Sequence, residues 1–276
     1  MKKKWDLQSR LQLKRNKFNI EELIKVLLEN RGIKRKKEIE DFLNPKLSDL
    51  DINSLGINKE DLAKTLKRIK TAIKKKELII IFGDYDADGI TGTAILWETL
   101  NELGANVMPY IPNRITEGYG LSEKGVEGMR KKYPEASLVI TVDNGIVATA
   151  GVDSANSLSL DVIITDHHVP SKKLPNAFSI IHSTKVCGAG VAWFLSRFLE
   201  EKIIGKRDLK KHLDLVAIAT IADLVPLIDS NRTLVKFGLE QLKNTKRVGL
   251  ISLFEVWKDF LNICVRIQSD IHAHIF

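Results

Sequence analysis

Cysteine, aromatic residues and long apolar runs are all scarce in this sequence of 276 residues. The two cysteines, Cys187 and Cys264, are too few and too far apart for a disulfide framework or a zinc site built on thiolates. The best apolar run, residues 213–228, contains Asp223 and is shorter than the roughly 18 residues of a membrane-spanning helix. Residues 1–20 lack the apolar segment of a secretion signal. These absences predict a cytoplasmic protein with no membrane partner.

Positive charge exceeds negative charge, with 43 lysine and arginine residues against 35 aspartate and glutamate residues and a net charge of +8. This excess is compatible with a polyanionic partner such as nucleic acid, although a lysine-rich solvated surface explains the totals equally well. The placement of the charges is more informative. Acidic residues gather in and after apolar segments while basic residues dominate elsewhere. This distribution favours an acidic metal site surrounded by a positive surface.

The hydrophobic pattern predicts a sheet between two helical regions. Helical spacing is seen at 20–28 and 39–43, and Asn58 is placed to cap a helix that runs to Lys75. Short apolar runs then alternate with helices, which is typical of a parallel sheet covered on both faces. Strands are expected at 78–82, 106–111, 138–142, 162–165 and 178–181, and helices at 91–103, 191–203, 209–224 and 234–242. The predicted fold class is α/β, with a mostly parallel sheet, helices on both faces and helical additions at both ends.

Acidic residues and histidines follow three of the predicted strands. The loop 83–89 contains Asp84, Asp86 and Asp88, the next strand ends at Asp143, and the third ends at 166–168, which reads Asp-His-His. In a parallel sheet the carboxyl ends of the strands meet at one edge, so these loops are expected to lie together. A further carboxylate, Asp223, lies in an otherwise apolar stretch, and a buried lone carboxylate needs a cation or hydrogen-bond donors.

Five or six carboxylates in one cleft repel one another and have raised pKa values unless a cation neutralises them. Oxygen ligands with one or two imidazoles suit Mn²⁺ or Mg²⁺, and the lack of thiolates argues against structural zinc. Two ions that share a bridging carboxylate, roughly 3.5–4 Å apart, clamp a phosphoryl oxygen and activate a water. The pattern therefore predicts metal-dependent phosphate chemistry.

Each motif taken alone has a structural alternative. Asp143 fits a turn or a helix cap, the histidine pair fits a surface loop, and Asp223 fits a helix cap or a buried ion pair. Their joint placement at successive strand ends is what favours a metal site. A dinucleotide-binding domain is disfavoured because acids, and not a G-x-G-x-x-G motif, follow the first strand. A phosphoacceptor receiver domain does not explain the histidine pair.

Six blocks of the sequence resemble one enzyme family. They lie in family order at 80–96 (IIFGDYDADGITGTAIL), 110–122, 139–146 (VITVDNGI), 161–170 (DVIITDHHVP), 187–194 and 219–242, and 42–50 is also similar. Together they resemble the catalytic core of the RecJ exonucleases, which belong to the DHH phosphoesterases. The resemblance covers roughly residues 40–243. It implies a helical segment at 1–57, a DHH catalytic core at 58–245 and a divergent tail at 246–276.

The resemblance also implies two ions, Mn²⁺ or Mg²⁺, and a set of ligands. The matching positions are Asp84, Asp86, Asp88, Asp143, His167 and Asp223. Asp86 and Asp88 are expected to hold one ion each. Asp143 is expected to bridge both ions, with Asp84 assisting at the first. His167 and Asp223 complete the second site. Some relatives have a metal-binding histidine four residues before the position of Asp86, and here that residue is Phe82, which predicts a more open first site.

Two further residues are expected to contact substrate. His168 is expected to contact the scissile phosphate and, with Asp143, to act in catalysis. Arg114 is a candidate for a charge-assisted phosphate contact, with an ion pair to Glu117 as the alternative. Ser122 is expected to cap a helix. Gly188 is expected to allow close packing or the approach of a phosphate to a helix N-terminus.

The activity implied by the resemblance is a single-stranded-DNA-specific 5′→3′ exonuclease in DNA repair and recombination, which hydrolyses phosphodiesters without a covalent intermediate. Two alternatives stay open. One is a phosphoesterase for short oligonucleotides, cyclic dinucleotides or pyrophosphate, and the other is a non-catalytic nucleic-acid-binding module. The blocks at 84–89, 117–121 and 222–227 favour the exonuclease. The complete set of carboxylates argues against the non-catalytic module.

The sequence departs from the family after about Leu253. RecJ proteins continue with a smaller second domain and an oligonucleotide-binding domain, and neither is found in these 276 residues. The expected partners are therefore single-stranded DNA, a separately encoded C-terminal part and repair proteins. We expect that a metal centre can form without the second domain while affinity, 5′ polarity and processivity are lost. An active enzyme and an impaired fragment are both compatible with the sequence.

Overall fold

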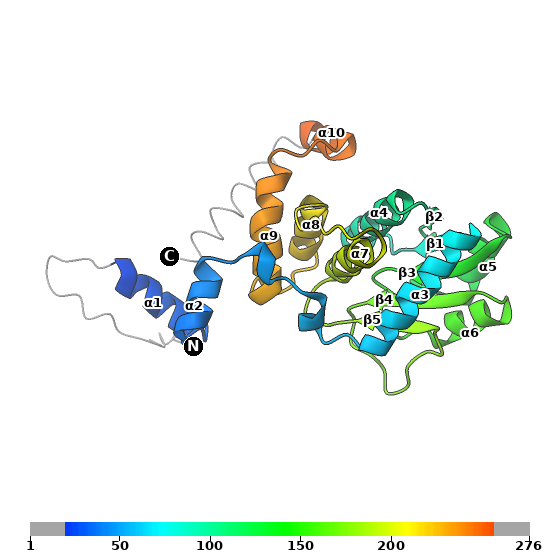
Figure 1. Ribbon diagram of the computed structural model, residues 1–276, viewed down its shortest axis with the longest axis horizontal. Coiled ribbons are helices and arrows are strands. Elements are labelled where there is room, and N and C mark those ends of the chain that lie inside the picture. Colours follow the sequence, from blue (N-terminus) through cyan, green and yellow to red (C-terminus); the bar gives the residue numbers. More distant parts are fainter. Residues whose placement is uncertain (1–19, 257–276) are drawn as a thin grey trace, which may run out of the picture. The chain divides into compact units, whose positions relative to one another are not determined.

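The computed structural model describes residues 20–256, which fall into two compact units (Figure 1). The larger unit comprises residues 47–243. The smaller unit includes helices α1 (Ile20–Asn30), α2 (Lys36–Leu43) and α10 (Val248–Val256). The division into 1–57, 58–245 and 246–276 stays a prediction, and most of the divergent tail lies outside the described residues. Within residues 20–256, no helix is long and apolar enough to cross a membrane.

The larger unit is built on one parallel sheet of five strands. The strands are β1 (Leu78–Phe82), β2 (Asn106–Tyr110), β3 (Ala136–Thr141), β4 (Asp161–Asp166) and β5 (Ser179–His182). Their order in the sheet is β2-β1-β3-β4-β5, and every pair is parallel. All five side chains of β1 are buried, as expected for a strand covered on both faces. The predicted fold class is confirmed.

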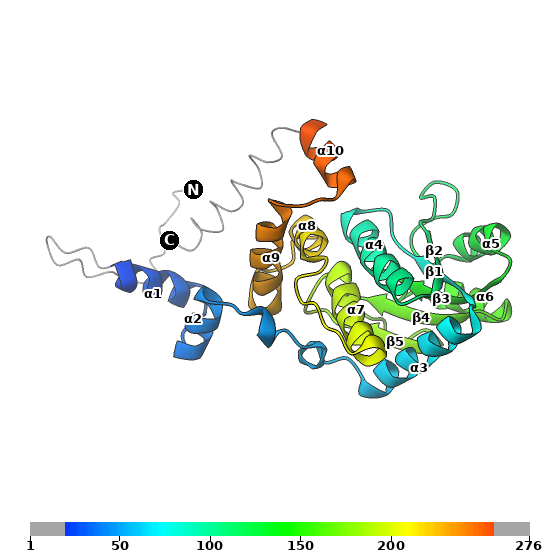
Figure 2. The ribbon, with the colours of Figure 1, turned by 45° about the horizontal axis from the view of Figure 1, so that its top comes forward.

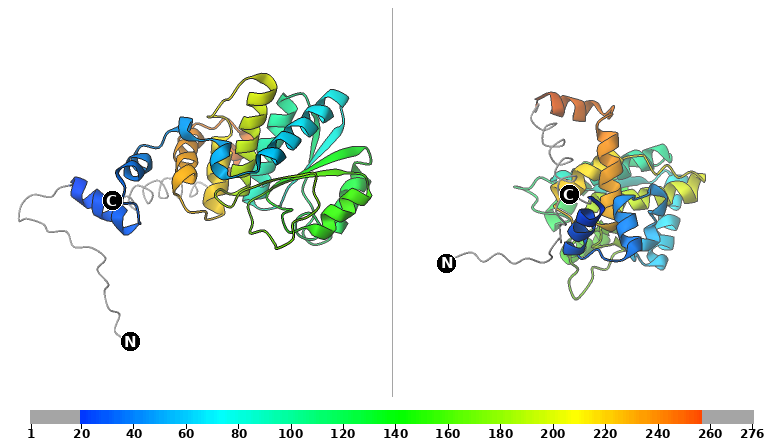
Figure 3. Two further views of the ribbon diagram at one scale, coloured as in Figure 1. Left: turned by 60° about the horizontal axis from the view of Figure 1, so that its bottom comes forward. Right: turned by 90° about the vertical axis from the view of Figure 1, so that its left-hand side faces the viewer.

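Helices cover both faces of the sheet (Figures 1, 2 and 3). Helices α3 (Lys59–Lys75), α4 (Ala87–Glu102) and α7 (Gly188–Ile204) pack on one face, and α5 (Glu123–Lys132) and α6 (Thr149–Ser157) pack on the other. Helices α8 (Leu213–Ala222) and α9 (Asp229–Leu242) pack against each other, and α8 also packs on α4. The core beneath α5 and α6 is aliphatic and aromatic, and includes Ile80, Phe82, Val126 and Val162.

Two short 3₁₀ turns, η1 (Leu47–Asp49) and η2 (Ile52–Leu55), lead into α3. The residues that follow β5 hold η2 in place. The Ser183 hydroxyl donates to the Leu55 carbonyl at 2.9 Å, and the Lys185 ammonium donates to the Ser54 carbonyl at 2.5 Å. The start of α3 is therefore tied to the edge of the sheet at which the strands end.

Polar caps set the helix starts, and one of them corrects a prediction. Asn58 caps α3 and Ser122 caps α5, as predicted. Helix α4 begins at Ala87 and not at Thr91, because the Asp86 carboxylate accepts the Gly89 N–H at 2.9 Å and caps the helix four residues earlier. The loop after β1 is consequently shorter than expected, and Asp88 lies in the first turn of a helix.

A substitution at Gly151 tests how closely α6 packs against the segment that connects β2 to α5. A Cβ at this position lies 1.7 Å from the Leu121 carbonyl oxygen, so the backbone has to move. We expect Gly151→Ala to reduce the free energy of unfolding by roughly 1–3 kcal/mol, as overpacked substitutions do. Gly249→Ala is the matched control, because no heavy atom lies within 4 Å of its added Cβ. Chemical denaturation measures both variants, and an unchanged stability for Gly151→Ala contradicts this packing.

Candidate metal centre

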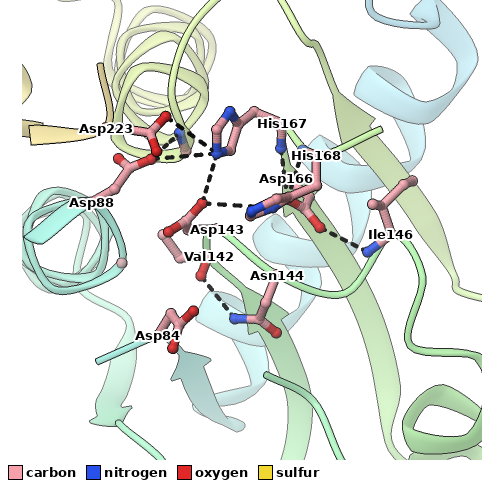
Figure 4. Close-up of polar contacts among 12 residues, drawn as sticks. Asp84, Asp88, Val142, Asp143, Asn144, Ile146, Asp166, His167, His168 and Asp223 are labelled. Carbon is pink, nitrogen blue, oxygen red and sulfur yellow. Dashed lines mark hydrogen bonds and ion pairs between the residues drawn. The ribbon is translucent and has the colours of Figure 1, made fainter. Parts of the chain in front are cut away.

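The predicted ligands lie at the carboxyl edge of the sheet, around β1, β3 and β4 (Figure 4). The strand order reverses between β1 and β3, which is where a doubly wound sheet opens a crevice for ligands. Asp84 follows β1, Asp143 follows β3, and His167 follows β4 directly. The topology therefore brings three segments that are far apart in the sequence to one place.

Asp143 is held in an uncommon backbone conformation beside β4. Its φ is 62°, in the left-handed region that few residues other than glycine adopt. Its N–H donates to the Thr165 carbonyl at 3.0 Å, and its side chain is only 3% exposed. Such strain persists where the surroundings impose it, and it is concentrated at functional sites.

Asp88 joins α4 to the first turn of α7. Its two carboxylate oxygens accept the N–H groups of Gly188 and Ala189, each at 2.7 Å. The free amides at a helix N-terminus favour an anion, and here a side chain supplies it. Of the two expectations for Gly188, close packing is therefore the one observed, since a Cβ there lies 2.5 Å from the Asp143 Cβ.

The His167 ring faces three carboxylates from three different segments (Figure 4). Its Nε2 lies 3.0 Å from Asp143 Oδ1, 3.6 Å from Asp88 Oδ2 and 3.7 Å from Asp223 Oδ2. Three buried atoms, His167 Nε2, Asp143 Oδ1 and Asp84 Oδ2, have no partner in hydrogen-bond geometry among the described residues. Buried polar atoms are nearly always paired, so this group of orphaned donor atoms fits a cation.

All six predicted ligands fall into overlapping groups whose ligand atoms lie within 4.8 Å of one another. The groups are Asp84, Asp86 and Asp143; Asp88, His167 and Asp223; and Asp143, His167 and His168. Asp143 and His167 each belong to two groups. This sharing is the arrangement that two neighbouring ions need. The roles of the individual residues as ligands stay predictions.

The carboxylates of the cluster resist ionisation. Burial and, to a smaller extent, the Asp88 charge raise the pKa of Asp143 and His167 opposes the shift, with a net pKa of about 7. Burial also raises the pKa values of Asp84 and Asp88. A bound cation favours the charged carboxylates, so the donor set of oxygens and imidazole suits Mn²⁺ or Mg²⁺.

Asp166 is a positioning residue to which the sequence analysis assigned no role. Its Oδ1 lies 2.8 Å from His168 Nδ1, and its Oδ2 accepts the Ile146 N–H at 2.8 Å. Burial favours the neutral acid, but these hydrogen bonds hold the pKa of Asp166 below its usual value. The hydrogen bond to Asp166 in turn raises the pKa of His168 to about 9. His168 is therefore positively charged at neutral pH, and its Nδ1 is committed to Asp166.

His182 supports the same loop, because its Nε2 lies 2.7 Å from the His168 carbonyl oxygen. Among the described residues, it is not in any of the three groups of candidate metal ligands. Phe82, at the position of a histidine in some relatives, is fully buried at the end of β1 and packs on Tyr110 with ring centroids 5.3 Å apart.

Two tyrosines and Arg114 lie beside the carboxylates. The Arg114 guanidinium lies 5.0 Å from the ring centroid of Tyr85, and Tyr85 meets Tyr119 edge to face at 6.2 Å. Burial and the nearby charge of Asp84 raise the pKa of the Tyr119 hydroxyl. The alternative ion pair of Arg114 is not formed in the described chain, since Glu117 bonds to Tyr110 and to the Asn113 N–H. Arg114 stays a candidate phosphate contact.

Asp223 differs from its prediction. It is not buried within an apolar helix but follows the last residue of α8, and its side chain is 30% exposed. Helix α8 ends at Ala222, the residue before Asp223, so the Asp223 carboxylate faces the cluster from its exposed side.

Residues 78–220, just over half of the chain, match the family model described as the DHH family, N-terminal domain. The chain belongs to the DHH family. It is 38% identical over 268 residues to the single-stranded-DNA-specific exonuclease RecJ of Bacillus subtilis (strain 168), which covers 92% of this chain and 33% of the relative. It is 35% identical over 255 residues to RecJ of Escherichia coli (strain K12), which covers 85% of this chain and 43% of the relative.

Solved structures agree with this assignment. RecJ from Thermus thermophilus in complex with Mn²⁺ has a TM-score of 0.68 and 34% identity, over 84% of this DHH chain and 33% of that chain. A second structure, exonuclease RecJ bound to manganese, has a TM-score of 0.65 and 38% identity, over 72% of this chain and 52% of that one. This chain thus spans a third to less than half of the length of these curated relatives.

The raised pKa of Asp143 makes the stability of the folded protein depend on pH. This pKa is higher in the folded than in the unfolded protein, so ionisation opposes folding: stability falls as pH rises from about 4 to about 7 and stays low above it. In EDTA at pH 8 we expect Asp143→Asn to be more stable than the wild type by on the order of 2 kcal/mol. Near pH 4 the difference disappears. Thermal unfolding measures this, with the exposed Asp153→Asn as the control. A destabilised Asp143→Asn at pH 8 contradicts the account.

The Asp166–His168 pair gives a second prediction. Replacing the charged partner with a neutral amide in Asp166→Asn removes the interaction that raises the pKa of His168. We expect this pKa to fall from about 9 toward the ordinary value of about 6.5. Nuclear magnetic resonance titration of the ring protons in metal-free protein measures it, and Asp153→Asn, the same change at an exposed position, is the control. An unshifted His168 titration in Asp166→Asn rejects the pairing.

Proposed function

We propose that this chain is the catalytic core of a RecJ-type exonuclease that degrades single-stranded DNA from its 5′ end, in DNA repair and recombination. The observation that carries the proposal is the convergence of all six predicted ligands, with buried donor atoms on His167, Asp143 and Asp84 that lack partners in the described chain. The similarity to RecJ supports the choice of single-stranded DNA as substrate. A chromosomal substrate fits a cytoplasmic location.

Two divalent ions fit the donor groups. Asp84, Asp86 and Asp143 are suited to hold one ion. Asp88, His167 and Asp223 are suited to hold the other, with Asp143 close enough to His167 to be shared. The RecJ relatives have structures with Mn²⁺ and with Mg²⁺, which supports either ion here. When bound, such ions polarise a phosphoryl oxygen and lower the pKa of a water molecule.

The chain's own groups bind and orient the phosphate. His168 carries a positive charge at neutral pH, its Nδ1 is fixed by Asp166, and its ring lies at the open side of the cluster with 44% of the side chain exposed. Its remaining N–H is available to donate to a phosphate oxygen, and it stabilises the negative charge that grows there during hydrolysis. Arg114, exposed above Tyr85, provides a second cation at the same rim.

Hydrolysis of labelled DNA tests the proposal. We expect the chain with Mn²⁺, alone or together with a separately produced C-terminal part of a RecJ relative, to release labelled mononucleotide from 5′-labelled single-stranded DNA and to leave duplex DNA intact. Asp143→Ala removes the shared carboxylate and is expected to lower the rate by at least ~100-fold. Asp153→Asn, on the far side of β3 in helix α6, is the control and keeps the rate.

Two other results reject this function. Cleavage confined to oligonucleotides of a few residues, cyclic dinucleotides or pyrophosphate assigns the chain to small substrates. Binding of Mn²⁺ and DNA without any hydrolysis identifies a non-catalytic nucleic-acid-binding module. Activity that appears only when a separately produced C-terminal part of a RecJ relative is added supports the proposed partner.

A further inference from the structure

The outer face of α3 carries a row of lysines, none of which is a predicted metal ligand. Residues Leu62, Ile69 and Ala72 bury one side of this helix against the sheet. The opposite side is exposed and basic. Its lysines, which we call the α3 lysine face, are Lys64, Lys67, Lys70, Lys74 and Lys75.

The charge of this face is not neutralised locally. Among the described residues, only Lys75 of the five forms an ion pair, with Glu77 at 3.7 Å. Two neighbouring acids bind Arg68 on the flank of the helix instead, Asp161 at 2.5 Å and Glu77 at 2.6 Å. The exposed Glu60, in the first turn of α3, is on the same side as the lysines, but in the described chain no ion pair joins it to any of the five. Lysines at 64, 67, 70 and 74 follow the helical repeat of three or four residues and extend over about 15 Å.

The α3 lysine face begins near the edge of the sheet that holds the metal centre. Helix α3 follows η2, which Ser183 and Lys185 tie to the end of β5. The helix ends at Lys75, just before β1 starts at the opposite edge. Helix α3 (labelled in Figure 2) therefore runs from the edge at which the strands end to the edge at which they begin.

We propose that the α3 lysine face binds the phosphate backbone of single-stranded nucleic acid, outside the metal centre; the choice of a single strand rests on the proposed function. Regularly spaced lysines bind phosphates without regard to sequence, by releasing counterions. A lipid surface fits less well. Membrane-surface helices insert large apolar side chains, whereas the apolar side of α3 is packed in the core. The outer side offers only Ala63 and the half-buried Thr71 between its charged residues.

Equilibrium binding in EDTA tests the proposal, because no cleavage takes place and the result does not depend on the proposed nuclease activity. The probe is a fluorescein-labelled oligothymidylate of about 30 nucleotides, followed by anisotropy at several salt concentrations. In the test variant four lysines are changed to glutamine, namely Lys64, Lys67, Lys70 and Lys74. Each phosphate contact on a single strand contributes about 0.7 to the slope of log K against log salt, so we expect the slope to fall by roughly 2 to 3.

A control variant loses the same net charge elsewhere. Its substitutions to glutamine are at Lys124, Lys131, Lys206 and Lys210, all exposed and none in α3. We expect this variant to keep the wild-type slope, with both variants showing the wild-type circular dichroism. If the slope falls equally in the two variants, binding depends only on net charge and the proposal is overturned. An unchanged slope in the test variant, or a loss of binding to phosphatidylserine vesicles without a loss of binding to DNA, also overturns it.

Discussion

The burial of several carboxylates together at the end of the sheet is the constraint on which the site depends. Asp143 and Asp88 are almost fully buried, and Asp143 ionises only near pH 7 in the folded chain. A fold keeps such a group in place only if other interactions hold the backbone. Here the left-handed Asp143 is anchored to Thr165, and Asp88 is anchored to the first amides of α7. The sheet and helices therefore hold acidic groups together that a cation stabilises.

The fold was largely predictable because it rests on apolar periodicity. The run 78–82 coincides with β1, and the other four predicted strands overlap β2 to β5 within one or two residues of each end. Asn58 and Ser122 were recognisable as caps from their chemistry. The start of α4 was not, because Asp86 serves both as a helix cap and as a predicted ligand, and its position in the acidic loop concealed the capping role.

The residues of the site were predictable from the sequence, but the contacts that position their side chains were not. Strand-end placement was enough to bring Asp84, Asp143 and His167 together, since parallel strands end at one edge. The exposure of Asp223 depends on where α8 ends, which an apolar run does not specify. The link from Asp166 to His168 and that from Tyr119 to Asp84 depend on side-chain rotamers. The sequence offered one sign of each contact. For His168 it was the aspartate directly before the histidine pair, and for Asp84 it was the tyrosine in the E-G-Y-G-L block.

The acids of the metal centre and the lysines of α3 lie in different parts of the larger unit. The acids converge at the crevice between β1 and β3, where metal-assisted phosphate chemistry is proposed. Exposed lysines line the outside of α3, which starts at the same edge. If the proposed ions are bound, they and the lysines of α3 would both attract the phosphates of a polyanion that the carboxylates alone repel.

The central claim is that the carboxylate cluster is a centre for two ions that share Asp143. Anomalous diffraction from crystals of this chain grown with Mn²⁺ tests it most directly. The account predicts two manganese peaks, one beside Asp84 and Asp86 and the other beside Asp88, His167 and Asp223, with the Asp143 carboxylate between them. A single peak that does not touch Asp143, or no peak at this edge of the sheet, contradicts it.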